Sequence, residues 1–340
     1  MKFVHTADTH LGFEFVKKTP RDKKGRMRRA QWVYDNFVAV VEHALEIEAE
    51  LFIHSGDLFN KSYIPREDLD LLIEPFGRLS RAGIPTLIIP GNHEKSEFPF
   101  DLFHGLKNVF AFDRPKSICL ELNGYRVGVA GFPFIRDHSR RTFLEALEAT
   151  EYDELRSDFN LLVSHQTFDG ATVGPADFTF NSGRSDTVSR EAIPLDFEYV
   201  AAGHIHRCQV LSHPRRPALR FVYPGSIQRM SFAEMNEEKA FVTGEVVGNR
   251  VEISFIPLPA WDMEMVEIEA GGRTAGSVEK EIREQGWRFR KDLLIRFNLT
   301  GGSRRGDYPE IDFENLLEEM PLVLECQLML KTAKGWVHAK

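Results

Sequence analysis

The chain of 340 residues has few of the features that define secreted or membrane proteins. It holds only three cysteines, Cys119, Cys208 and Cys326, and their odd number and wide spacing suit a reducing compartment better than a disulfide framework. It lacks an apolar run of about eighteen residues, the length from which a membrane-spanning helix is inferred. No signal-like apolar region precedes Asp8 and His10. We therefore expect a soluble, cytoplasmic protein with no membrane association.

An excess of positive charge is also missing, because the formal net charge is −8. The sum does not indicate nucleic-acid binding, but the distribution of charge matters more than the sum. Two small basic clusters occur at 136–141 and 215–220, and a longer one consists of Lys17, Lys18, Arg21, Lys23, Lys24, Arg26, Arg28 and Arg29. Such a run is either a solvated loop or a contact to phosphates. Its place just after Asp8 and His10 favours phosphate contact, with Lys17, Lys18 and Arg21 as candidates.

Five short motifs supply oxygen and imidazole nitrogen. They are DTH, SGDLFN, PGNHE, SHQ and GHIH, and their candidate metal ligands are Asp8, His10, Asp57, Asn92, His165, His204 and His206. The motifs supply no sulfur, which argues against a closed structural zinc site and suits manganese, iron or zinc in an open one. Seven ligands complete two metal ions only if one carboxylate is shared. Asp57, behind a glycine at a strand end, is the natural bridge.

Each motif follows an apolar run that predicts a short buried strand. The runs are KFVHTAD, AELFIHSGD, IPTLIIPGNH, FNLLVSH and FEYVAAGH. Open α/β sheets place their ligands at the carboxyl ends of such strands. Asp8 and His10 are two residues apart, as are His204 and His206, so each pair would point the same way in an extended chain. A single motif can arise by chance or as a simple turn, but five in this order favour a functional site.

The segments between and after the motifs predict the domain organisation. Helical apolar spacing runs from about Trp32 to Glu50 and from about Glu67 to Ala82, and this alternation of strand and helix predicts a layered α/β core. Two prolines in PLPAWDM, residues 257–263, mark a boundary. Beyond it, strands at MEMVEIEA, DLLIRFNLT and PLVLECQLMLK and helices at TAGSVEKEIREQ and DFENLLEEM predict a small α/β domain. We expect domains at 1–258 and 263–340.

The order of the motifs resembles that of the calcineurin-like metallophosphoesterase superfamily. YVAAGHIHRCQVL followed by FVYPGSIQRMSFAEMNEEKAFV, together with HTADTHLG and HSGDLFN, is similar to the SbcD-type nucleases of DNA double-strand-break repair. The resemblance is strong to about residue 258 and weak beyond. It implies a layered β-sandwich core flanked by helices and a DNA-capping α/β domain at 263–340. It also implies DNA and an SMC-like ATPase subunit of the SbcC type as partners, and it allows a homodimer.

The resemblance also implies a role for each motif residue. It places Asp8, His10, Asp57 and His206 on one divalent ion and Asp57, Asn92, His165 and His204 on the other, with manganese the expected metal. A hydroxide bridging the two metals would attack the phosphodiester, while His93 assists the leaving group. Asn60 departs from many archaeal and eukaryotic members, which have histidine there. Asparagine can donate a hydrogen bond to phosphate but cannot titrate near neutrality, so the polarity of an exonuclease activity stays open.

Several features allow two interpretations. The long polar loop between His165 and His204 is either a substrate contact, through Arg184 and Arg190, or a packed surface excursion. The phenylalanines at 98–112 favour core packing over base stacking.

Two rival functions stay open beside a DNA exonuclease or endonuclease. One is a small-substrate phosphodiesterase or phosphatase, disfavoured by the C-terminal domain and the basic run, and the other is a non-enzymatic DNA-end binding protein, disfavoured by the complete ligand set.

Overall fold

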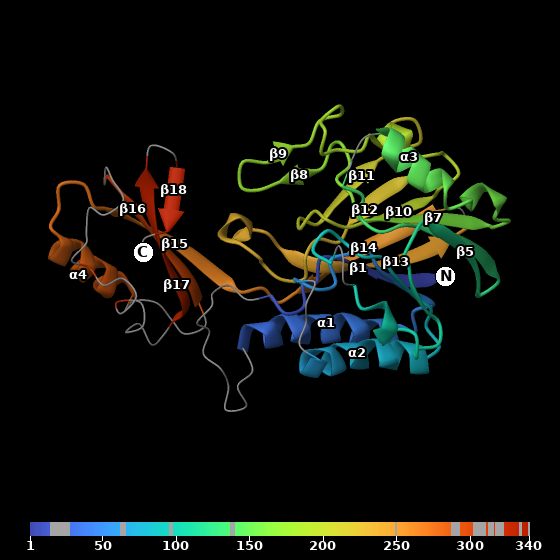
Figure 1. The fold of residues 1–340 in the computed structure, drawn as a ribbon, viewed down its shortest axis with the longest axis horizontal. Helices are drawn as coiled ribbons and strands as arrows, with labels where there is room; N and C mark the ends of the chain where they lie inside the picture. The colour runs from blue at the N-terminus through green and yellow to red at the C-terminus, as the bar shows by residue number, and fades with distance from the viewer. Residues whose placement is uncertain are drawn as a thin grey trace. The chain divides into compact units, whose positions relative to one another are not determined.

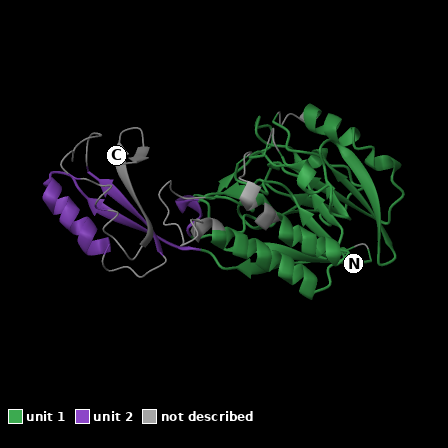
Figure 2. Cartoon of the chain, turned by 60° about the horizontal axis from the view of Figure 1, so that its bottom comes forward, with its two compact units in different colours: residues 1–14, 22–230, 236–260 green, residues 15–21, 231–235, 261–340 purple. Residues whose placement is uncertain are grey.

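The computed structural model divides the chain into two compact units (Figure 2). Unit 1 comprises residues 1–14, 22–230 and 236–260, and unit 2 comprises residues 15–21, 231–235 and 261–340. The residues that the structure describes are 1–13, 28–61, 66–94, 98–136, 140–248, 250–286, 293–301, 311, 316, 323–332 and 335–338. No helix in these described ranges is long and apolar enough to cross a membrane.

Unit 1 is built on two six-stranded sheets (Figure 1). The first has the strand order β14-β13-β1-β2-β3-β4, with β1 Lys2–Thr6, β2 Leu51–His54, β3 Thr86–Ile88, β4 Val109–Ala111, β13 Lys239–Val247 and β14 Arg250–Leu258. The second has the order β11-β12-β10-β7-β6-β5, with β5 Lys116–Leu122, β6 Tyr125–Gly131, β7 Phe159–Ser164, β10 Tyr199–Ala202, β11 Gln209–Ser212 and β12 Arg220–Tyr223. A separate hairpin pairs β8 (Thr172–Val173) with β9 (Phe178–Thr179).

Helices and short 3₁₀ turns complete unit 1. The helices are α1 (Arg28–Glu46), α2 (Arg66–Arg81) and α3 (Arg140–Glu148), and the 3₁₀ turns are η1 (Phe100–Leu102), η2 (Tyr152–Glu154) and η3 (Arg190–Ala192). Both helices predicted between the first motifs are confirmed as α1 and α2. Helix α1 ends four residues before the predicted Glu50, because Glu48 adopts a left-handed conformation, with φ 51°, that a helix cannot continue.

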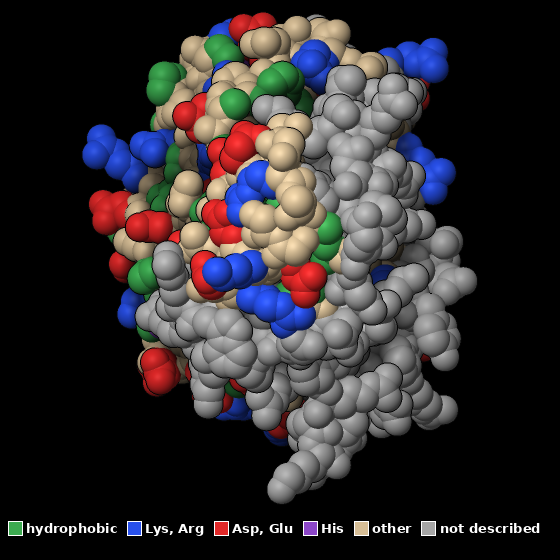
Figure 3. Space-filling model, turned by 90° about the vertical axis from the view of Figure 1, so that its left-hand side faces the viewer, with side chains coloured by type: hydrophobic (Ala, Val, Ile, Leu, Met, Phe, Trp, Pro, Cys, Tyr) green, Lys and Arg blue, Asp and Glu red, His purple; other side chains and the backbone are tan. Residues whose placement is uncertain are grey.

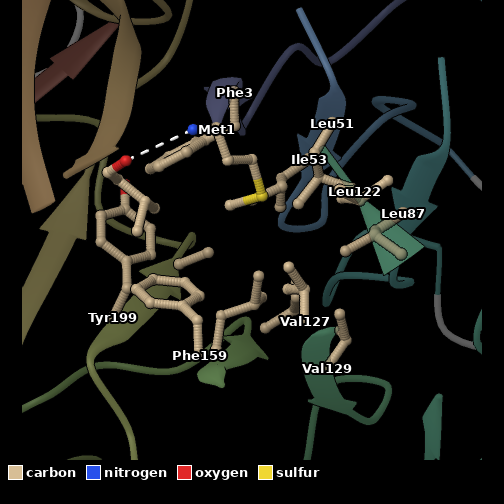
Figure 4. Close-up of a cluster of buried hydrophobic side chains, with 14 of the residues drawn as sticks. Met1, Phe3, Leu51, Ile53, Leu87, Leu122, Val127, Val129, Phe159 and Tyr199 are labelled. Carbon is tan, nitrogen blue, oxygen red and sulfur yellow. Dashed lines mark hydrogen bonds between the residues drawn. The ribbon is translucent and has the colours of Figure 1, made fainter. Parts of the chain in front are cut away.

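The two sheets pack face to face around an apolar core (Figure 4). Phe3, Leu51 and Ile53 of the first sheet meet Phe159 and Tyr199 of the second, and all five are buried. The ring centroids of Phe3 and Tyr199 lie 5.1 Å apart in an edge-to-face arrangement. Helices α1 and α2 lie along the outside of the first sheet in Figure 1, so its central strands are buried on both faces. The layered α/β class predicted from the sequence is confirmed.

Parallel pairing brings the motifs to one end of the sandwich. Strands β1, β2 and β3 pair in parallel in the first sheet, and β7 and β10 do so in the second. All five predicted motif strands are present and buried. Because every motif follows the carboxyl end of one of these strands, the polar residues of each sheet share one edge.

The phenylalanines after PGNHE belong mainly to the interior. Phe98, Phe103 and Phe112 are buried, while Phe100 and Phe110 are half-buried. Phe98 stacks on Phe103 with ring centroids 5.6 Å apart. Core packing, rather than a surface for base stacking, therefore describes this segment.

Among its described residues, unit 2 has a four-stranded sheet of order β15-β16-β17-β18, the helix α4 and the 3₁₀ turn η4. These are β15 (Asp262–Glu269), β16 (Leu293–Thr300), β17 (Val323–Thr332), β18 (Gly335–His338), α4 (Ala275–Gly286) and η4 (Phe232–Glu234). Val278 and Ile282 of α4 pack with Ile268, Ile295 and Phe297 of the sheet. The three predicted strands and the first predicted helix are present. The second predicted helix, DFENLLEEM, lies almost wholly outside the described residues, and β18 was not predicted.

A substitution at Gly244 would test the packing of the first sheet. Gly244 of β13 lies opposite Phe3 of β1, and a Cβ at this position would overlap the Phe3 ring. Gly244→Ala should therefore displace Phe3 and lower the free energy of unfolding by about 1–3 kcal/mol, measured by urea denaturation. Gly105→Ala is the matched control, because a Cβ there would meet no heavy atom within 4 Å. An equal effect of both substitutions would contradict this view of the core.

Candidate metal centre

Four of the candidate ligands have backbone conformations that side-chain-bearing residues rarely adopt. The φ angles are 48° at Asp8, 45° at His10, 53° at Asp57 and 88° at His204. Each such residue costs of order 1–3 kcal/mol, so the surrounding structure must hold it in place. Hydrogen bonds from Asp8 N to Gly56 O and from His10 N to Asp57 O, both 3.0 Å long, tie the first two motifs together.

These angles correct one expectation from the sequence. Asp8 and His10 were expected to converge because alternate residues of an extended chain share a face. The side chains do converge, but through left-handed backbone at both residues, not through an extended strand. The same holds for His204 at the start of the HxH pair. Strand β1 ends at Thr6, so the motif lies in the loop beyond it.

Asp8, His10 and His206 form one group of potential ligands. One donor atom from each lies within 4.8 Å of the other two. The Nε2 atoms of His10 and His206 face each other at 3.1 Å. Burial, followed by the charge of His206, holds the pKa of His10 well below its ordinary value, so His10 is neutral and able to act as a ligand. Two nitrogens and a carboxylate directed at one point suit a divalent cation.

Asp57, His165 and His204 form a second group, which Asn92 completes. Oδ1 of Asn92 lies 2.7 Å from Nδ1 of His204 and 3.1 Å from Nε2 of His165. Oδ2 of Asp57 lies 3.4 Å from the same His165 nitrogen. The donors are again one carboxylate, imidazole nitrogens and an uncharged amide oxygen. This set also fits a divalent cation.

The Asp57 carboxylate lies between the two groups. Its Oδ2 is 3.7 Å from Nε2 of His10 in the first group and 3.4 Å from Nε2 of His165 in the second. Its Oδ1 accepts a hydrogen bond of 2.9 Å from the backbone N–H of His93. One oxygen is thus oriented by the backbone, while the other faces both groups.

The ionisable groups of the site shift one another's pKa values. Burial disfavours the charged form of His165, but Asp57 and Asp8 outweigh this effect and raise the pKa of His165 to about 9. Burial alone would raise the pKa of Asp57, and the charge of His165 lowers it well below the ordinary value. Burial raises the pKa of Asp8 to about 6. Cations would take over the role of the His165 proton, so metal binding should release protons.

His93 occupies the solvent-facing side of the site. Its side chain is 42% exposed, and its Nε2 lies 3.9 Å from Oδ2 of Asp57. Its Nδ1 donates to the backbone carbonyl of Asn60 over 3.1 Å. Because a carbonyl only accepts, this bond places a proton on Nδ1. The sequence suggested a role only for the Asn60 side chain, whereas the backbone of Asn60 makes this contact.

Two histidines near the site, His5 and His54, have structural roles. His5 is held between Tyr199 Oη at 2.9 Å and Ser55 Oγ at 2.8 Å. His54 lies 3.0 Å from Thr9 Oγ1. Burial, the larger cause, lowers the pKa of both rings to about 3, so both are neutral. The carbonyl of Ser55 also accepts from Nδ1 of His165 at 2.8 Å, which turns the other ring nitrogen of His165 into the site.

Glu94 carries no predicted role, yet it ties two motifs together. Its carboxylate is buried and accepts from the backbone N–H of Gly91 at 2.8 Å and of Phe59 at 2.7 Å. Burial, followed by the charge of Asp57, raises the pKa of Glu94 to about 8. A Cβ at Gly91 would overlap the Asp57 carboxylate, which explains the glycine. The SGDLFN and PGNHE loops are thereby fixed against each other.

The predicted basic contacts separate into three cases. Lys17, Lys18 and Arg21 lie outside the described residues. Arg184 is half-exposed, forms two bonds to Asp186 at 2.9 and 2.8 Å, and lies over the Phe178 ring.

Arg190 has a structural role. It bonds Asp169 at 3.2 Å and the carbonyl of Ser212 at 2.7 Å. Val188 and Ile193 of the same loop are buried in the core. This part of the loop is a packed excursion that does not offer Arg190 to a substrate.

Comparison with known proteins gives consistent matches. The family model described as calcineurin-like phosphoesterase matches residues 1–208. The chain is 27% identical over 330 residues to SbcD of the nuclease SbcCD from Staphylococcus epidermidis, covering 90% of this chain and 81% of that protein. It is 28% identical over 288 residues to the DNA double-strand break repair protein Mre11 of Methanocaldococcus jannaschii, covering 79% and 67%. The Mre11 protein of Archaeoglobus fulgidus is 25% identical over 353 residues, covering 94% and 75%.

The solved structures that match the chain share little sequence with it. The protein TT1561 of Thermus thermophilus superimposes with a TM-score of 0.46 and 12% identity, covering 75% of this chain and 98% of that chain. A dimetal phosphatase from Danio rerio has a TM-score of 0.46 and 11% identity, covering 75% and 95%.

The position of Asp57 leads to a prediction about stoichiometry. Asp57→Ala should reduce the manganese content from two ions per chain to none, because both donor groups lose their shared carboxylate. The measurement is metal analysis after loading with Mn²⁺ and desalting. Asp158→Ala removes a surface carboxylate paired with Arg126 and is the matched control. Retention of a full pair of ions by Asp57→Ala would rule out the bridging position.

Proposed function

Since the chain belongs to the calcineurin-like phosphoesterase family, we propose that it is a two-metal phosphodiesterase that cleaves DNA, as exonuclease or endonuclease, during DNA end processing and double-strand-break repair. The observation that carries this proposal is the convergence of seven donor residues from five motifs, with Asp57 between the two groups. The DNA substrate follows from the similarity to SbcD and Mre11 over most of the chain.

We assign the ligands as the two groups suggest. Asp8, His10, Asp57 and His206 would hold one divalent ion, and Asp57, Asn92, His165 and His204 would hold the other. Oxygen and imidazole donors suit manganese, which we propose as the metal. When bound, the pair of ions would supply Lewis-acid activation of a water molecule and of the phosphate. The uncharged Asn92 contributes an oxygen without adding charge that would repel a phosphodiester.

The residues of the chain itself supply the remaining chemistry. Nε2 of His93 faces away from the Asn60 carbonyl, and the protonated ring can donate from it to the leaving oxygen as a general acid. The Asp57 carboxylate, oriented by the His93 backbone, lies 3.9 Å from this nitrogen. The Asn60 side chain can donate a hydrogen bond to a phosphate oxygen.

The proposed partners extend this function. We propose duplex DNA and an SMC-like ATPase of the SbcC type as partners in the cytoplasm, with unit 2 acting as a DNA-capping domain and a homodimer as one possible assembly. Basic and acidic side chains intermix among the described residues on the face drawn in Figure 3. An extended DNA contact would therefore depend on local clusters, of which the run from Lys17 to Arg29 is the largest in the sequence.

A substrate panel separates the rival functions. Turnover with Mn²⁺ of double-stranded DNA, single-stranded DNA, bis-p-nitrophenyl phosphate and cyclic nucleotides should show cleavage of DNA. Turnover of cyclic nucleotides or phosphomonoesters without cleavage of DNA would favour a small-substrate enzyme. Binding of DNA ends without any hydrolysis would favour a tethering protein.

His93 gives a prediction about catalysis. His93→Leu should lower DNA cleavage by about 10²–10⁴-fold through loss of the general acid, while both ions and the fold remain. The backbone N–H that orients Asp57 is unchanged by this substitution, so the metal content should not fall. His104→Leu, at an exposed histidine paired with Asp101, is the control. Loss of metal from His93→Leu would instead make His93 a ligand.

Unit 2 gives a prediction about substrate length. Removal of residues 263–340 should spare hydrolysis of bis-p-nitrophenyl phosphate, because unit 1 has its own core and contains all seven donors. Cleavage of duplex DNA should fall by about a hundredfold, the cost of displacing a scissile phosphate by about 1 Å. Equal losses on both substrates would mean that unit 2 only stabilises unit 1, and no loss on either would favour a small-substrate enzyme.

A further inference from the structure

A buried ammonium group lies directly behind one of the proposed ligands. Lys239 is the first residue of β13, and its side chain is fully buried. Its Nζ donates to the backbone carbonyl of His206 at 3.1 Å and to Ser226 Oγ at 3.0 Å, and it lies 3.4 Å from Oε2 of Glu237. A buried charge of this kind is costly unless it is paired and hydrogen-bonded, so its position is strongly constrained.

The His206 carbonyl receives a second donor from the same loop. The backbone N–H of Ser226 bonds it at 3.1 Å. Gly225, with φ 80°, packs so closely that a Cβ there would lie 2.7 Å from this carbonyl oxygen. Two donors, Lys239 and the Ser226 N–H, therefore fix the orientation of the peptide group after His206. The orientation of the His206 ring depends on that peptide group.

Glu237 extends the support to the next residue along the chain. Its Oε2 pairs with Lys239, and its Oε1 accepts from Nε of Arg207 at 3.0 Å. Arg207 in turn bonds Asp177 at 2.7 Å. Lys239 and Glu237 thus hold the two residues that flank this peptide bond: Lys239 bonds the His206 carbonyl, and Glu237 bonds the Arg207 side chain. Nε2 of His206 meanwhile lies 3.1 Å from Nε2 of His10.

We infer that Lys239 is a positioning residue that sets the affinity of one cation site, the one formed by Asp8, His10 and His206. This inference rests on the proposed two-metal function. Groups that orient a ligand, without touching the metal, typically change metal affinity by about 10–100-fold. The alternative is a purely structural ion network, which would affect folding stability but not the balance between the two sites.

The test is a Mn²⁺ titration of the full chain, followed by electron paramagnetic resonance and calorimetry. Lys239→Met, which keeps the length and removes the charge, should weaken one Mn²⁺ by about 10–100-fold. The other ion, at Asp57, Asn92, His165 and His204, should keep its affinity. Lys116→Met is the matched control, since Lys116 Nζ also bonds a backbone carbonyl, that of Ala111, at 2.9 Å.

A double variant identifies which site is affected. His10→Ala should weaken the same ion, so Lys239→Met added to His10→Ala should cause little further loss at that site, because two changes acting on one site are not additive. Ser226→Ala, which removes one acceptor of the ammonium and leaves the charge, should give a smaller loss at the same site. This variant also keeps the test valid if Lys239→Met does not fold.

Three outcomes would overturn the inference. They are equal weakening of both ions by Lys239→Met, no weakening of either ion in a folded variant, and fully additive losses with His10→Ala. Failure of the proposed function looks different. The wild-type chain would then bind two Mn²⁺ with the selective effect of Lys239→Met and yet cleave no DNA.

Discussion

The Asp57 carboxylate is the group on which the arrangement of the site depends. It is almost completely buried, it lies between two sets of histidine, aspartate and amide donors, and the His165 ring lies 3.4 Å from it. A buried carboxylate needs both hydrogen-bond donors and positive charge nearby. The His93 backbone supplies the donor, and the converging imidazoles supply a position for positive charge.

The fold meets that requirement because both sheets contribute side chains to the site. Strands β1, β2 and β3 deliver Asp8, Asp57 and Asn92 from the first sheet, and β7 and β10 deliver His165 and His204 from the second. The apolar core between the sheets fixes the distance over which these side chains meet. Behind them lies a layer of neutral or paired polar groups, including His5, His54 and Glu94, whose bonds hold the loops. The candidate metal site therefore lies at the edge of the core.

An accepting and a donating side chain support the two sides of the candidate site. Glu94 accepts two backbone N–H groups that belong to the SGDLFN and PGNHE loops. Lys239 donates to the backbone carbonyl of His206 in the GHIH loop. A carboxylate suits a loop that turns its N–H groups inward, and an ammonium suits one that turns a carbonyl inward. In both cases the contact is made to the backbone, so the ligand side chains stay available for cations.

The sequence by itself determined the class of fold, the five motif strands and the first two helices, and it named the seven candidate donors, because apolar period and donor chemistry are local properties of the chain. Only the tertiary structure decided how those donors converge. The left-handed backbone at Asp8 and His10, the Asn60 carbonyl as partner of His93 and the Lys239 support of His206 all depend on contacts between residues far apart in the chain. Such contacts leave no repeating pattern in the sequence, because the partners of each residue depend on which strands become neighbours in the fold.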